Sequence, residues 1–100
     1  MKGVDLLEID DFIPLLEKHF LLRDGGFSVP FRLHEVTPYH GHAAAGAGRA
    51  PFYLTFLGPA KPLLSHGIYH FSTEDGRDLS MFLVPVGQVD GGTIYQAVYN

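Results

Sequence analysis

Most of this chain alternates apolar and polar residues with a period of two, the spacing of a β-strand. In the segment 27–36 every second residue of the first part is apolar: Phe27, Val29, Phe31 and Leu33. Because successive side chains of a strand point to opposite faces, this pattern predicts a strand with one apolar face. Pro30 has no N–H to donate, so it predicts a sheet edge or a bulge at that point.

Five further segments have the composition of strands, with β-branched and aromatic residues between turn signals. They span residues 19–23, 52–57, 68–73, 79–87 and 93–100. Within 52–57, we expect Phe52, Leu54 and Phe56 to face the core. The last two segments flank Asp90-Gly91-Gly92 and are typical of a β-hairpin.

One segment, residues 10–18, has helical signals. Asp10 is a candidate N-cap, Asp11 adds negative charge in the first turn, and Pro14 falls where its missing N–H costs little. Helical spacing places four residues on the face toward the sheet: Phe12, Leu15, Leu16 and His19.

The elements together predict a mainly β fold: a small antiparallel barrel or sandwich of six or seven strands with one short N-terminal helix. The alternation serves a barrel and a sandwich equally, so that choice stays open. One hundred residues predict a single domain, 1–100. Residues 40–51 are rich in Ala and Gly and predict a flexible loop.

Composition and charge narrow the class of protein. The chain has no cysteine, which excludes disulfides, thiolate metal sites and a cysteine nucleophile. A formal charge of −4 with scattered basic residues argues against nucleic-acid binding. No apolar run is long enough for a membrane span, and the acidic start does not resemble a signal peptide. We expect a cytoplasmic protein or a component of an exported assembly.

Histidines are the candidate metal ligands. His40 and His42 lie two residues apart near Glu35, which would add an oxygen ligand, whereas the plainer interpretation is a pair of solvated loop side chains. His66 and His70 are four apart, but their neighbours favour a strand, on which they would not share a helical face. Neither pair completes a zinc ligand set, so no metal or other cofactor is expected.

Catalytic motifs are missing from the sequence. No serine lies in a Gly-x-Ser-x-Gly elbow, and the carboxylates surround the helix start and a turn. The segment 46–49 resembles a phosphate-binding loop, but a strand follows it where a helix is needed. We therefore expect no enzyme.

Tyrosines in or beside strands are the candidate binding residues, because an exposed tyrosine commonly anchors a protein or sugar contact. The alternative is that they close the ends of the barrel. Arg49 lies just before a strand, where its guanidinium either binds a carboxylate through two hydrogen bonds or anchors the loop to the barrel. The candidate set is Arg49, Tyr53, Tyr69, Tyr95 and Tyr99.

Several segments resemble a family of small bacterial single-domain proteins catalogued as a domain of unknown function. The resemblance covers nearly the whole chain and is most specific in Gly48-Arg49-Ala50-Pro51-Phe52 and Phe82-Leu83-Val84-Pro85-Val86-Gly87. It carries over no catalytic residue. It implies an association with proteins that resemble phage tail-collar or tail-fibre components.

We therefore expect a non-enzymatic module that binds a protein partner or itself, as an accessory or structural part of a phage-tail-like fibre. One alternative is a small ligand- or carbohydrate-binding module that uses Tyr and His residues. A second alternative is a metal-assisted hydrolase built on His40, His42 and Glu35.

Overall fold

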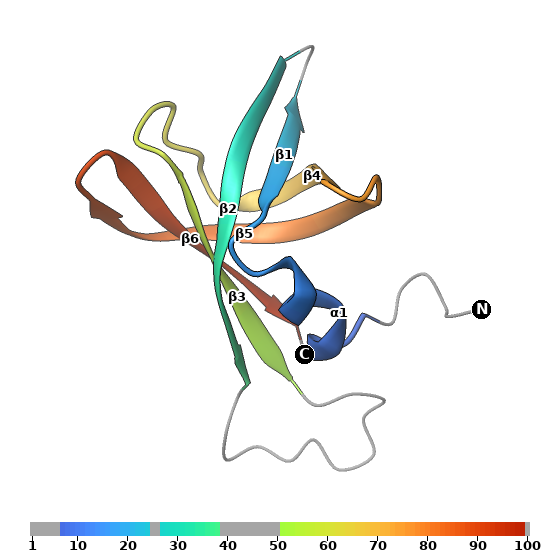
Figure 1. Ribbon diagram of the computed structural model, residues 1–100. Helices are drawn as coiled ribbons and strands as arrows, with labels where there is room; N and C mark the ends of the chain where they lie inside the picture. The colour runs from blue at the N-terminus through green and yellow to red at the C-terminus, as the bar shows by residue number, and fades with distance from the viewer. Residues whose placement is uncertain (1–6, 25–26, 39–50, 100) are drawn as a thin grey trace.

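The computed structural model describes residues 7–24, 27–38 and 51–99. Within these residues, six antiparallel strands close into one barrel in the order β1-β2-β3-β6-β5-β4, and β4 pairs with β1 (Figure 1). The mainly β fold is thus confirmed, and it is a barrel rather than a sandwich. The strands are β1 (His19–Asp24), β2 (Phe27–Pro38), β3 (Phe52–Pro59), β4 (Gly67–Thr73), β5 (Asp78–Val89) and β6 (Gly92–Tyr99).

The barrel is built on two long strands that each change partner along their length. Residues 27–32 of β2 pair with β1, and residues 32–38 pair with β3. Likewise, residues 78–83 of β5 pair with β4, and residues 83–89 pair with β6. The outer half of each hairpin, β1–β2 and β5–β6, therefore extends past the closed part of the barrel, as Figure 1 shows.

Pro30 lies in the half of β2 that pairs only with β1, and Pro85 lies in the half of β5 that pairs only with β6. Leu33 exchanges backbone hydrogen bonds with Glu17 and Lys18, on the side of β1. Backbone groups alternate sides along a strand, so those of Pro30 face away from β1. The expected edge position of Pro30 is confirmed, whereas the bulge in β2 lies between Leu33 and Glu35. Both prolines reduce the donors that an added strand would use.

The core is aromatic and fills the barrel. Phe52, Leu54 and Phe56 are fully buried, as the alternation predicts. Around them, rings pack edge to face, tilted or stacked: Phe20 meets Phe56 edge to face with centroids 5.0 Å apart, and Phe71 stacks on Phe56. The other buried apolar residues are Phe12, Leu15, Phe20, Leu22, Phe31, Leu33, Phe71, Met81, Leu83, Tyr95 and Ala97.

The helix is shorter than the expected 10–18. It consists of α1 (Ile9–Phe12) and one 3₁₀ turn, η1 (Ile13–Leu15). The N-cap is Glu8 and not Asp10, because Glu8 forms a capping box in which its N–H donates to Asp11 Oδ2 at 2.7 Å.

The helix ends early because β2 competes for the backbone that follows it. The Glu17 N–H donates to the Leu33 carbonyl, and the Leu33 N–H donates to the Lys18 carbonyl. Phe12 and Leu15 are buried as expected, but His19 opens β1 and is exposed, so its predicted place on the helical face was wrong.

Candidate functional site

Tyr95 is a core residue and not a surface anchor. Its side chain is fully buried against Phe31, with ring centroids 5.2 Å apart. Its hydroxyl accepts the backbone N–H of Leu64 at 3.0 Å. A tyrosine is tolerated in the core when its polar end finds a partner, so Tyr95 ties the β3–β4 connection to the barrel. It cannot present its ring to a partner protein.

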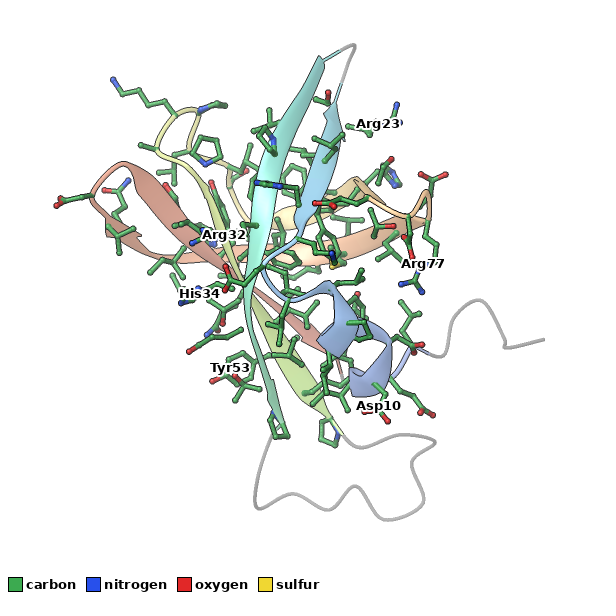
Figure 2. All side chains as sticks on the ribbon, in the orientation of Figure 1. Asp10, Arg23, Arg32, His34, Tyr53 and Arg77 are labelled. Carbon is green, nitrogen blue, oxygen red and sulfur yellow. The ribbon has the colours of Figure 1, made fainter. Side chains whose placement is uncertain are left out.

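The other candidate tyrosines are half-buried, and each has different surroundings. Tyr99 stacks on Phe52 at the end of the barrel that α1 covers. Tyr69 donates its hydroxyl hydrogen to the Ser65 carbonyl at 2.7 Å. Tyr53 lies on β3 opposite Val98, with its side chain outside the barrel (Figure 2). Of the candidate tyrosines, Tyr95, Tyr99 and Tyr69 thus contribute contacts within the fold, and Arg49 lies outside the described residues.

The histidines do not form a metal centre in the described part of the chain. His40 and His42 lie outside it, and Glu35 is exposed on β2. His66 contacts the Phe82 ring, with centroids 6.1 Å apart, and His70 lies on β4. Among residues 7–24, 27–38 and 51–99, no three His, Cys, Asp or Glu side chains are placed to hold a metal ion.

Four apolar side chains gather on the outside of β4, β5 and β6, and we call them the outer-wall patch. Ile68 and Phe82 are direct cross-strand partners and are 69% and 51% exposed. Leu83 pairs with Ala97, and continuing that register places Phe82 next to Val98, which is 44% exposed. Val84, two residues beyond Phe82 on the same face, completes the patch at 37%.

The outer-wall patch has the size of the largest apolar patch on a typical small protein. The exposed fractions of its four side chains amount to roughly 350 Å² of mostly apolar surface. An apolar patch of this extent on a small protein commonly marks a site of interaction. No charged side chain belongs to it, although the chain carries a formal charge of −4.

Next to the patch lies a group of polar side chains on β1, β4 and β5, which we call the polar cluster. Arg23, labelled on β1 in Figure 2, donates from Nε to Ser72 Oγ at 3.0 Å. Ser72 donates to Asp78 Oδ1 at 3.0 Å. Ser80 Oγ lies 2.6 Å from His70 Nδ1. These five residues line a surface hollow of about 460 Å³.

Neither the outer-wall patch nor the polar cluster was predicted from the sequence, although the sequence contains a signal for the patch. Residues 81–84 are four consecutive apolar residues. In the single layer of a barrel wall, alternate residues of such a run must face outward. Phe82 and Val84 do so, while Met81 and Leu83 are buried. The polar cluster joins residues from three strands, so no pattern within a single sequence segment predicts it.

Neither helix of the described residues is long or apolar enough to cross a membrane. No curated protein and no solved structure matches the chain. A family model matches residues 7–99, which include every strand of the barrel and both features of its outer wall. The chain therefore belongs to the family described as Domain of unknown function (DUF6916).

Proposed function

We propose that the protein is a non-enzymatic interaction module that docks against a second copy of itself through the outer-wall patch. The observation that carries this proposal is the contiguous exposure of Ile68, Phe82, Val84 and Val98 on one face. Such a surface gains free energy when it leaves water, by about 25 cal/mol for each Å² buried.

The size of the patch fits a second copy as the occupant, and its lack of charge limits the repulsion between two copies. Two chains that each carry −4 repel one another, and an uncharged patch is where they approach at least cost. Because interfaces are about 60% apolar, roughly 350 Å² of apolar surface is the centre of about 600 Å² on each copy. The total of about 1,200 Å² is at the lower end of specific interfaces, so we expect weak association.

The strand edges favour docking through the face of the wall. An exposed edge invites another strand to pair with it, and native proteins prevent this with proline. Pro30 lies in a half of β2 that pairs only with β1, and Pro85 lies in a half of β5 that pairs only with β6. Edge-to-edge pairing is therefore discouraged at both places, whereas nothing comparable protects the face that bears Phe82.

The setting we propose is an accessory part of a phage-tail-like fibre. In such an assembly many copies are held close together, and the high effective concentration makes a weak interface sufficient. The metal-hydrolase alternative gains no support from the described residues, which hold no ligand group of three.

Light scattering on the purified chain at several concentrations tests the proposal. We expect the mean mass to rise above the 11.0 kDa of one chain as concentration increases. Phe82→Ser is expected to keep the mass at that of the monomer. Leu63→Ser is the matched control, because Leu63 is 59% exposed but lies in the β3–β4 connection outside the patch. A wild-type monomer at every concentration, or equal association of Phe82→Ser, would contradict the proposal.

The proposed setting has its own test. Tagged wild-type chain and Phe82→Ser are used to capture proteins from the native host, and mass spectrometry identifies what is bound. We expect a tail-fibre-like component with wild type that is lost with Phe82→Ser. Self-association in solution without such a component would leave the docking surface standing and reject the fibre.

A further inference from the structure

The polar cluster has a consequence separate from self-association. We propose that Arg23, His70, Asp78 and Ser80 bind a neutral polyhydroxyl ligand, a sugar, in the hollow that they line. Its volume of about 460 Å³ lies within the range of small-molecule sites.

Internal hydrogen bonds hold the cluster in place before any ligand arrives. Arg23 is fixed through Nε by Ser72, and Ser72 is in turn fixed by Asp78. Ser72 is 8% exposed and therefore joins an exposed arginine to an exposed aspartate from beneath. Side chains that are already ordered lose less conformational entropy on binding, which favours recognition of a small ligand.

The remaining groups offer both donors and acceptors. Since Arg23 uses Nε for Ser72, its two terminal amino groups are further donors. Asp78 accepts through Oδ1 and has a second carboxylate oxygen as an acceptor. When Ser80 donates to His70 Nδ1, the imidazole proton lies on Nε2 and is a third donor position. A sugar hydroxyl both donates and accepts hydrogen bonds, so adjacent hydroxyls of one sugar can pair with the donors of Arg23 and His70 and with the acceptor of Asp78.

The charge of the cluster favours a neutral ligand over an anion. Arg23 and Asp78 carry opposite charges and are joined through one hydroxyl, so their charges cancel. A phosphate or carboxylate near Arg23 would also approach the carboxylate of Asp78, and this repulsion opposes its binding.

A titration followed by ¹H–¹⁵N spectra of the full chain tests the site. The probes are galactose, glucose, N-acetylglucosamine and inorganic phosphate. We expect saturable shifts of the amides of Arg23, His70 and Ser80 with at least one of the sugars and none with phosphate. Saturable shifts with phosphate alone, or no saturable shift with any sugar, would overturn the proposal.

Two variants and a control tie any binding to the cluster. Arg23→Met removes the charged donors and is expected to weaken sugar binding by about tenfold or more. Ser80→Ala frees the His70 ring, and we expect a smaller loss, so the test does not depend on one variant folding. Ser28→Ala is the matched control, because Ser28 lies on β2 next to Arg23 and does not line the hollow. Affinity that is unchanged in both cluster variants would reject the site.

Discussion

Phe52 and Tyr99 stack with ring planes 2° apart and centroids 5.0 Å apart, at the end of the barrel where β3 begins and β6 ends. The two residues are register partners. Phe12 of α1 contacts both rings, with centroid distances of 5.8 Å to Phe52 and 5.3 Å to Tyr99. These three rings join the N-terminal helix to the last strand, so the helix closes this end of the barrel.

The first prediction concerns this aromatic cluster. We expect Tyr99→Ala to lower the free energy of unfolding by about 2–4 kcal/mol, because it removes a half-buried ring that contacts both Phe12 and Phe52. Tyr99→Phe keeps the ring and is expected to cost less than about 1 kcal/mol. Urea unfolding measures both. A cost for Tyr99→Ala no greater than that of Tyr99→Phe would show that the stacking contributes nothing.

The second prediction tests the core. Phe56 is fully buried between Phe20 and Phe71, with centroids 5.0 Å and 6.0 Å away. Phe56→Ala is expected to cost about 3–5 kcal/mol through lost transfer energy and the cavity that remains. Ile68→Ala, at a residue 69% exposed, is expected to change stability by less than about 0.5 kcal/mol. Similar losses for the two variants would mean that the core is assigned to the wrong face.

The third prediction concerns Gly58, whose missing side chain makes room for a core ring. A Cβ at this position would lie 2.6 Å from Phe31. Phe31 is 1% exposed and held by Phe71 and Tyr95, so its ring has little freedom to move. We expect Gly58→Ala to cost about 1–3 kcal/mol by overpacking.

Gly87 is the matched control for Gly58. It lies on β5 in the same barrel, and a Cβ there would meet nothing within 4 Å. Gly87→Ala is therefore expected to leave the melting temperature nearly unchanged. Thermal unfolding of the two alanine variants gives the comparison, and a Gly58→Ala variant as stable as Gly87→Ala would refute the steric argument.

The sequence predicts much of the barrel because buried and outward-facing residues alternate along its strands. Phe52, Leu54 and Phe56 alternate with residues of the outer wall, and the turn at Asp90 and Gly91 joins the last hairpin as expected. Sequence alone did not separate a barrel from a sandwich, because that depends on whether β4 pairs with β1. This pairing joins Phe20 to Thr73, which are 53 positions apart in the chain.

The outer-wall patch was harder to predict because β6 inverts the simple hydrophobic pattern. Its buried face carries Thr93, Tyr95 and Ala97, whereas Val98 is 44% exposed. The tyrosine is accepted in the core because the Leu64 N–H reaches its hydroxyl, a contact across 31 positions that no local pattern contains. The residues expected to bind partners were therefore partly structural, and the exposed valine was overlooked.

The fourth prediction is a dependence of stability on pH through Glu74. Its carboxylate accepts the backbone N–H of His19 at 2.8 Å, and this hydrogen bond lowers the pKa of Glu74 below its ordinary value of 4.5. The positive charge of Lys18 lowers it further, and partial desolvation opposes both. A carboxyl with a depressed pKa in the folded state stabilises the fold above its ordinary pKa, and this contribution is lost as pH falls through the lowered value.

Glu74→Gln removes the titration and is expected to make the stability curve flatter below pH 4.5 than that of the wild type. His19→Ala is the informative control, because it deletes the imidazole but retains the backbone N–H, the larger cause of the lowered pKa. We therefore expect His19→Ala to keep most of the slope. Melting temperatures measured from neutral to acid pH show whether the backbone N–H or the imidazole of His19 causes the pH dependence. If the slope is lost equally in both variants, the effect belongs to the side-chain pair, in which His19 Nδ1 and Glu74 Oε2 are 3.5 Å apart.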